Sequence, residues 1–118
     1  MEVKKFSILM CVKDGGEYLN EQIESIINQD FLKWELTVVD DGSVDNSFEI
    51  LENFSKIEKR IKIIKNHRNL GILKSFVFNA KKLEGEWIVF CDQDDIWAEN
   101  KLSTLNRFIN NKCGYDLF

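Results

Sequence analysis

Residues 87–95 read WIVFCDQDD, an apolar run that ends in a dense group of carboxylates. The first five residues are apolar and include β-branched and aromatic types, which predicts a short buried strand. The next four hold three acids, Asp92, Asp94 and Asp95, with Gln93 between them. Carboxylates this close repel one another unless they ionise around a cation or share protons. The stretch therefore predicts a strand that ends at a cation site.

A second acidic pair follows another apolar run. Residues 36–39 read LTVV, and Asp40 and Asp41 come directly after them, followed by Gly42 and Ser43. Two acidic strand ends in one small domain favour a functional site. The alternative is a solvated Asp-Gly turn that binds nothing.

The composition is typical of one soluble domain. The chain has 118 residues, of which 44% are hydrophobic and 31% charged, so we expect residues 1–118 to form a single unit. The net charge of −4 offers no basic face for nucleic acid. No apolar stretch approaches the roughly 20 residues that span a bilayer, and the first residues lack a signal-peptide core. We therefore expect a cytoplasmic protein with no transmembrane segment and no nucleic-acid partner.

The three cysteines are Cys11, Cys91 and Cys113. Their number is odd and no CxxC pair occurs, so neither a disulfide framework nor a zinc site is indicated. We expect buried free thiols without a functional role. Cys11 and Cys91 each lie in the last part of a predicted strand, which would allow them to be neighbours across the sheet.

Strand-like and helix-like segments alternate along the chain. The pattern predicts strands at 6–12, 34–39, 61–64 and 87–91, and helices with apolar faces at 18–27, 48–54, after Gly71 to about Leu83, and 102–109. This alternation predicts an α/β fold built from right-handed βαβ units, with a mostly parallel sheet covered by helices on both faces.

The carboxyl ends of such strands are where ligands bind in open parallel sheets. The loop around Asp14, the Asp40-Asp41 pair and residues 92–95 all follow strands, so they are expected to converge on one crevice. Two acids have simpler readings. Asp14, with Glu17 three residues later, is equally consistent with a cap of the first helix, and Asp45 is expected to cap rather than to bind a ligand.

A set of short motifs carries a resemblance to a known family. In order they are residues 7–10, Tyr18-Leu19, Gln22-Ile23, Ser25-Ile26, Gln29, Trp34-Glu35, residues 40–46, residues 69–71, residues 85–88 and residues 92–95. With this order and spacing, nearly the whole chain resembles the N-terminal, donor-binding half of a family 2 glycosyltransferase with the GT-A (Rossmann-like) fold. The form DQDDIW is most similar to the rhamnosyltransferase-like branch, which builds bacterial surface polysaccharides.

The resemblance implies a metal-dependent, inverting transfer of a sugar from a UDP- or dTDP-sugar to a polysaccharide or lipid-linked acceptor. The divalent metal, Mn²⁺ or Mg²⁺, would be held by one or two carboxylates with diphosphate oxygens completing its shell. Asp94 matches the family's metal ligand best, and Asp92 and Asp95 are further candidates whose roles the sequence does not separate.

The resemblance also implies a set of contacts with the nucleotide sugar. Asp40 matches the position that accepts from the N3–H of uracil or thymine, and Asp41 lies beside it. The loop from Val12 to Asp14 would pack against the base. Lys74 is a candidate for the diphosphate, with a solvated helix surface as its alternative. The complete set of nucleotide-sugar candidates is Val12, Asp14, Asp40, Asp41, Gly71, Lys74, Asp92 and Gln93.

The chain departs from the family in two respects. The family places a proline and a Tyr-Asn pair after the first strand, whereas residues 11–14 read CVKD. The catalytic base of inverting members lies in the second half, so we expect a truncated chain without a base or acceptor region. A face exposed by that loss predicts a homodimer, and the function class suggests a position at the inner membrane face.

Two alternatives differ in function class. One is a non-catalytic nucleotide-sugar-binding fragment. The other is a receiver-like signalling domain, which also has an acidic Mg²⁺ pocket, but such a domain carries its acid pair after the first strand, whereas here the pairs follow the second and fourth predicted strands.

Overall fold

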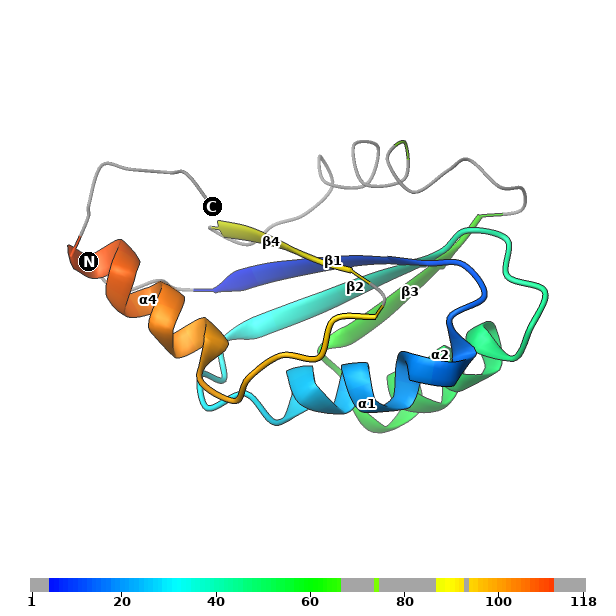
Figure 1. Cartoon of the computed structure of the whole chain (residues 1–118), viewed down its shortest axis with the longest axis horizontal. Helices are drawn as coiled ribbons and strands as arrows, with labels where there is room; N and C mark the ends of the chain where they lie inside the picture. The colour runs from blue at the N-terminus through cyan, green and yellow to red at the C-terminus, as the bar shows by residue number, and fades with distance from the viewer. Residues whose placement is uncertain (1–4, 67–73, 75–86, 93, 112–118) are drawn as a thin grey trace.

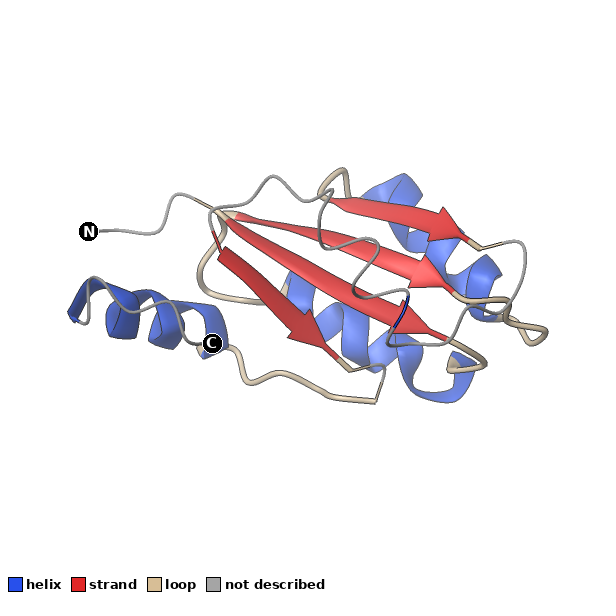
Figure 2. Cartoon of the chain, turned by 90° about the horizontal axis from the view of Figure 1, so that it is seen from above, coloured by secondary structure: helices blue, strands red, loops and turns tan. Residues whose placement is uncertain are grey.

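The computed structural model describes residues 5–66, 74, 87–92 and 94–111. Four parallel strands form one sheet: β1 (Phe6–Val12), β2 (Trp34–Asp40), β3 (Ile61–Lys65) and β4 (Trp87–Cys91), in the order β3-β2-β1-β4. Figure 2 shows the four strands running in the same direction. The predicted parallel α/β fold is confirmed.

In the described part of the chain, three helices accompany the sheet: α1 (Gly16–Ile27), α2 (Ser47–Ile57) and α4 (Lys101–Asn111). In Figure 1, α1 and α2 lie side by side under one face of the sheet. These are the helices expected around residues 18–27, 48–54 and 102–109. The expected helix from after Gly71 to about Leu83 lies outside the described residues, apart from Lys74.

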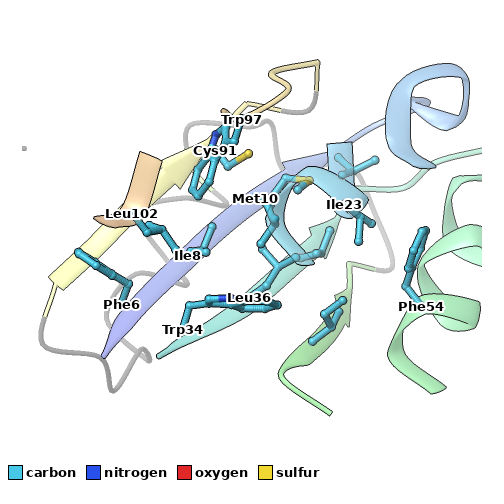
Figure 3. Packing of buried hydrophobic residues seen from close by; sticks show 14 of the residues in the cluster. Phe6, Ile8, Met10, Ile23, Trp34, Leu36, Phe54, Cys91, Trp97 and Leu102 are labelled. Atoms are coloured by element: carbon cyan, nitrogen blue, oxygen red, sulfur yellow. The ribbon is translucent and has the colours of Figure 1, made fainter. Parts of the chain in front are cut away.

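The main hydrophobic core fills the space between the sheet and these helices. Along β1, Phe6, Ile8, Met10 and Val12 are buried in this cluster, because alternate side chains of a strand point to the same face. Figure 3 shows Ile23 from α1, Phe54 from α2 and Leu102 from α4 around the same strands.

The opposite face of the sheet carries a smaller cluster of Leu9, Cys11 and Val39. Because both of its faces are buried, β1 has the continuous apolar sequence typical of a central parallel strand.

Cys11 and Cys91 lie on adjacent strands, and both are buried free thiols as predicted. However, Cys91 is in register with Met10 and belongs to the main core, whereas Cys11 belongs to the small cluster. The two residues are therefore neighbours on adjacent strands, but their thiols point to opposite faces of the sheet. Cys113 lies outside the described residues.

The strand order reverses next to β1. The chain builds outward from β1 to β3 and then returns to the other side of β1 with β4. In open parallel sheets the crevice at such a reversal, beyond the carboxyl ends of the strands, is the usual ligand site. The loops that follow β1, β2 and β4 all lie at this edge.

Candidate functional site

Asp40 is the last residue of β2, and its side chain is fully buried. Its Oδ1 accepts a hydrogen bond from the Ser43 amide at 3.3 Å. Its Oδ2 is buried and has no hydrogen-bond partner. A buried carboxylate oxygen without a donor is costly, and among the buried, unpartnered side-chain atoms of the described residues this one alone belongs to a carboxylate.

Asp41 is also fully buried, but it is held differently. Its Oδ1 accepts from Asn66 Nδ2 at 2.8 Å, and its backbone amide donates to the Val12 carbonyl at 2.8 Å. Gly42 follows with a φ of 79°, a conformation that favours glycine. Because both acids are buried, the alternative of a solvated Asp-Gly turn is wrong.

Asp14 lies in the loop after β1, exposed and with a φ of 52°. Its Oδ1 accepts from the backbone amides of Val44 at 2.8 Å and Asp45 at 3.3 Å. Its own amide donates to Ser43 Oγ at 2.9 Å. The N-cap of α1 is Gly15, without a side-chain bond, so the alternative reading of Asp14 as a helix cap is wrong. Asp14 instead binds the loop after β2.

Asp45, in the loop after β2, also forms a hydrogen bond with the loop after β1. Its Oδ2 accepts from the Gly16 amide at 3.1 Å, and its Oδ1 accepts from the Ser47 amide at 2.9 Å and the Ser47 hydroxyl at 2.5 Å. Slight desolvation raises the pKa of Asp45, but the hydrogen bonds from Ser47 and Gly16 outweigh it and lower the pKa. Asp45 therefore satisfies the first amides of both α1 and α2, but it does so from outside the N-cap position of α2, which is Asn46, so the expected N-cap at Asp45 is wrong in position. We call residues 14–16 with 43–47 the cross-loop unit.

The acidic loop after β4 differs from Asp40 and Asp41 in exposure. Asp92, Asp94 and Asp95 are all exposed. The Asp95 amide donates to the Asp92 carbonyl at 3.1 Å, which closes a tight turn, and Asp95 Oδ2 lies 4.0 Å from Lys101 Nζ. The carboxylates are thus at the surface, where a ligand can reach them.

The donor set of this loop fits a shared metal site. Within the described parts of the chain, no three metal-ligating side chains converge. A Mg²⁺ or Mn²⁺ ion that binds with a diphosphate needs only one or two protein carboxylates, because phosphate oxygens and waters complete its shell. Exposed hard-oxygen ligands at a strand end match that requirement better than they match an all-protein cage.

Three polar residues at α1, which we call the α1 polar stripe, hold the chain that follows β4. Gln22 and Ser25 are on α1 and Gln29 lies just beyond its end, with spacings of three and four residues that keep them on one side. Gln22 and Gln29 are almost completely buried. Gln22 Nε2 donates to the Asp92 carbonyl and to Cys91 Sγ, the latter at 3.2 Å. Ser25 Oγ accepts from the Trp97 amide at 3.0 Å. Gln29 Nε2 donates to the Ala98 carbonyl at 2.7 Å, and Gln29 Oε1 accepts from the Leu102 amide at 3.0 Å.

The role of the α1 polar stripe was not predicted from the sequence. Gln22 on the apolar side of α1, and Gln29 just after the helix in the same spacing, were a usable signal, because buried amides need partners. Their partners are backbone groups about 70 positions away in the chain, and only the fold brings these together.

The remaining candidates are less informative. Val12 is buried in the main core, and its carbonyl accepts from Asp41. Lys74 is exposed. Gly71 and Gln93 lie outside the described residues.

The family model for glycosyl transferase family 2 matches residues 7–115. The chain belongs to glycosyl transferase family 2. An uncharacterised glycosyltransferase of Haemophilus influenzae is 37% identical over 105 residues, which cover 86% of this chain and 32% of that protein. The Escherichia coli protein WfgD, named as a UDP-Glc:alpha-D-GlcNAc-diphosphoundecaprenol beta-1,3-glucosyltransferase, is 38% identical over 92% of this chain and 43% of its own length.

Solved structures agree with the family assignment. The crystal structure of S. aureus TarS in complex with UDP matches 91% of this chain and 32% of its own, with a TM-score of 0.83 and 31% identity. A Pyrobaculum calidifontis mannosyltransferase, solved with GDP-Man and Mn²⁺, has a TM-score of 0.84 at 18% identity, which supports the fold alone.

These findings confirm the resemblance to a GT-A glycosyltransferase and exclude the receiver-like alternative. This glycosyl transferase family 2 chain spans less than half the length of the relatives described above. None of the helices in the described part of the chain has the length and apolar character needed to cross a bilayer.

Proposed function

We propose that this chain is the donor-binding part of a metal-dependent, inverting glycosyltransferase. In this proposal a UDP- or dTDP-sugar binds across the carboxyl ends of β1, β2 and β4. The observation that carries the proposal is the buried, unpartnered Oδ2 of Asp40 at the end of β2. A uracil or thymine base offers the donor that this atom lacks.

The base assignment follows from hydrogen-bond chemistry. Asp40 is acceptor-only when it is ionised, and its Oδ1 is already engaged by Ser43. The N3–H of uracil or thymine would donate to Oδ2, and this bond would offset the cost of the unpartnered atom. Cytosine has no hydrogen at N3, so it cannot make the same bond. Because Oδ2 is buried, the base must displace the groups that cover it.

The diphosphate is assigned to the acidic loop after β4. Asp94 is the proposed principal metal ligand, with Asp92 and Asp95 as neighbours that ligate or orient. A bound Mn²⁺ or Mg²⁺ supplies charge neutralisation to the departing diphosphate. Further members of the proposed donor site are Val12 and Asp14 near the base, Gly71 and Gln93, and Lys74 toward the diphosphate.

The acceptor and the catalytic base belong to the rest of the proposed enzyme. The name of WfgD includes a lipid-linked diphosphoundecaprenol sugar, and TarS was crystallised with UDP. These relatives support a uridine nucleotide and a lipid-linked or polysaccharide acceptor. We further propose that the enzyme belongs to the rhamnosyltransferase-like branch and that it forms a homodimer. We place it in the cytoplasm, at the inner membrane face. The alternative is a binding fragment without turnover, since every candidate named on this chain is a binding residue.

A nucleotide-selectivity experiment tests the proposal. Calorimetric titration with UDP, dTDP and CDP, each with Mn²⁺, should show CDP binding at least about tenfold more weakly, as expected when a buried polar group loses its partner. Asp40→Asn can present an N–H to cytosine N3, so its preference for UDP over CDP should fall.

Asp30→Asn is the matched control. Asp30 is an exposed acid between α1 and β2, at the opposite edge of the sheet, and its replacement should leave the preference unchanged. Equal binding of UDP and CDP that is insensitive to Asp40→Asn contradicts the proposal.

A further inference from the structure

Asp14 adopts a backbone conformation that few residues tolerate. Its φ of 52° is in the left-handed region, where any side chain with a Cβ is disfavoured relative to glycine, although Asp and Asn tolerate it best. Asp14 is the one non-glycine residue with positive φ in the described chain. A strained backbone conformation persists where surrounding contacts hold it, and such positions cluster at functional sites.

The contacts of Asp14 all reach the loop after β2. Its Oδ1 accepts two amides, from Val44 at 2.8 Å and from Asp45 at 3.3 Å, and its own amide donates to Ser43 Oγ at 2.9 Å. One exposed side chain and one backbone amide thus fix three consecutive residues of the facing loop. The left-handed conformation places both groups of Asp14 in reach of that loop at the same time.

The same loop holds the carboxylate of Asp40. The Ser43 amide donates to Asp40 Oδ1 at 3.3 Å, while Oδ2 is buried and unpartnered. The Ser43 residue is therefore bonded through its hydroxyl to Asp14 and through its amide to Asp40. Where Ser43 lies decides which oxygen of Asp40 is engaged and which is left for a ligand.

We infer that Asp14 is a positioning residue for Asp40: it fixes residues 43–45 so that Oδ1 of Asp40 is engaged and Oδ2 is left without a protein donor, for the nucleobase to pair with. The inference rests on the proposed function, and it gives Asp14 an indirect role in place of direct contact with the nucleotide. Preorganisation of this kind raises affinity because the loop is ordered before the ligand binds.

Two variants separate the conformation of Asp14 from its hydrogen bonds. Asp14→Gly suits the positive φ but removes the Oδ1 acceptor. Asp14→Asn keeps an Oδ1 acceptor and also tolerates positive φ, so it serves as the conservative rescue. The measurements on the full chain are amide hydrogen exchange of Ser43, Val44 and Asp45, the affinity for UDP with Mn²⁺, and the thermal unfolding temperature.

The inference predicts that Asp14→Gly accelerates exchange of these three amides and weakens UDP binding by roughly tenfold, while Asp14→Asn stays near wild type. Unchanged amide exchange in Asp14→Gly overturns the inference. A lower unfolding temperature with unchanged UDP affinity also overturns it, since that is the signature of a purely structural residue. A loss of affinity in Asp14→Asn equal to that in Asp14→Gly overturns it in favour of direct ligand contact.

The amide exchange measurement also separates the positioning role of Asp14 from the proposed nucleotide-sugar binding. If the wild-type chain binds no nucleotide, the proposed function fails, whereas faster exchange in Asp14→Gly still supports the hold of Asp14 on the loop.

Discussion

The backbone amide of Leu102, the second residue of α4, donates a 3.0 Å hydrogen bond to the side-chain Oε1 of Gln29 just beyond α1. The first amides of a helix have no partner within the helix, so Gln29 satisfies one of them from a distance. The other end of the same side chain, Nε2, donates to the Ala98 carbonyl at 2.7 Å. One buried amide thus fixes the start of α4 and the chain that leads to it from the acidic loop.

Replacing Gln29 by an apolar residue of similar size should destabilise the protein clearly. Gln29→Met leaves the Leu102 amide and the Ala98 carbonyl without their partners, and we expect a loss of about 2–4 kcal/mol in the free energy of unfolding. Denaturant unfolding monitored by circular dichroism measures this value.

Gln22→Met is the informative comparison, because Gln22 is equally buried but only half satisfied. Its Nε2 donates to the Asp92 carbonyl, whereas its Oε1 is buried without a partner. Methionine removes that unpaired oxygen together with the bond, so Gln22→Met should cost less than Gln29→Met. Asn20→Ala, at an exposed position of α1, is the control. A larger loss for Gln22→Met than for Gln29→Met contradicts this account of the α1 polar stripe.

Glu35 in β2 should make stability depend on pH. Desolvation raises its pKa, but hydrogen bonds from Lys5 and Ser7 outweigh that effect and hold the pKa below its ordinary value. A carboxyl whose pKa is lowered by folding contributes stability above its unfolded pKa, and that contribution is lost as pH falls through the folded pKa. Glu35→Gln should therefore be less stable than wild type at neutral pH.

The difference between Glu35→Gln and wild type should shrink as the solution is acidified, because the wild-type carboxyl then becomes neutral too. Thermal unfolding from neutral to acidic pH measures it. Glu52→Gln, on the exposed face of α2, is the control and should change stability little at any pH. A stability difference for Glu35→Gln that is constant over the whole pH range would show that the ionised carboxylate contributes nothing.

The buried cysteines should be unreactive in the native protein. Burial raises the pKa of Cys11 and of Cys91 to about 12, so neither forms the nucleophilic thiolate at neutral pH. In a Cys113→Ser background, iodoacetamide should modify these thiols only at the rate at which the protein opens, and denaturant should accelerate the reaction. Rapid native-state alkylation of either thiol would be inconsistent with the packing of both clusters.

The features that could be predicted from the sequence are those that depend on residues close together in the chain. Residues 87–91 are apolar enough to specify β4, and the acids after β2 and β4 mark strand ends, because parallel strands place their carboxyl ends at one edge. The partners of Asp14 and Gln29 were not predictable in the same way. A carboxylate beside a helix start is equally suited to capping its own helix or to binding a facing loop, and only the packing of β1 against β2 decides between them.

The unpartnered oxygen of Asp40 illustrates the same limit. The sequence indicates an acid at the end of a strand, but not which of its two oxygens is engaged. That choice depends on where the Ser43 amide lies, at 3.3 Å from Oδ1, and therefore on the cross-loop unit as a whole.

The most direct test of a metal-dependent donor site is calorimetric titration of UDP into the wild-type chain and into Asp94→Asn, each with and without Mn²⁺, with Asp30→Asn as the control for loss of one charge. We predict that Mn²⁺ strengthens UDP binding to the wild type and to Asp30→Asn, and that Asp94→Asn loses this gain. Binding of UDP that is equally strong without Mn²⁺, or a gain that Asp94→Asn retains in full, would contradict the assignment of the metal site to the acidic loop after β4.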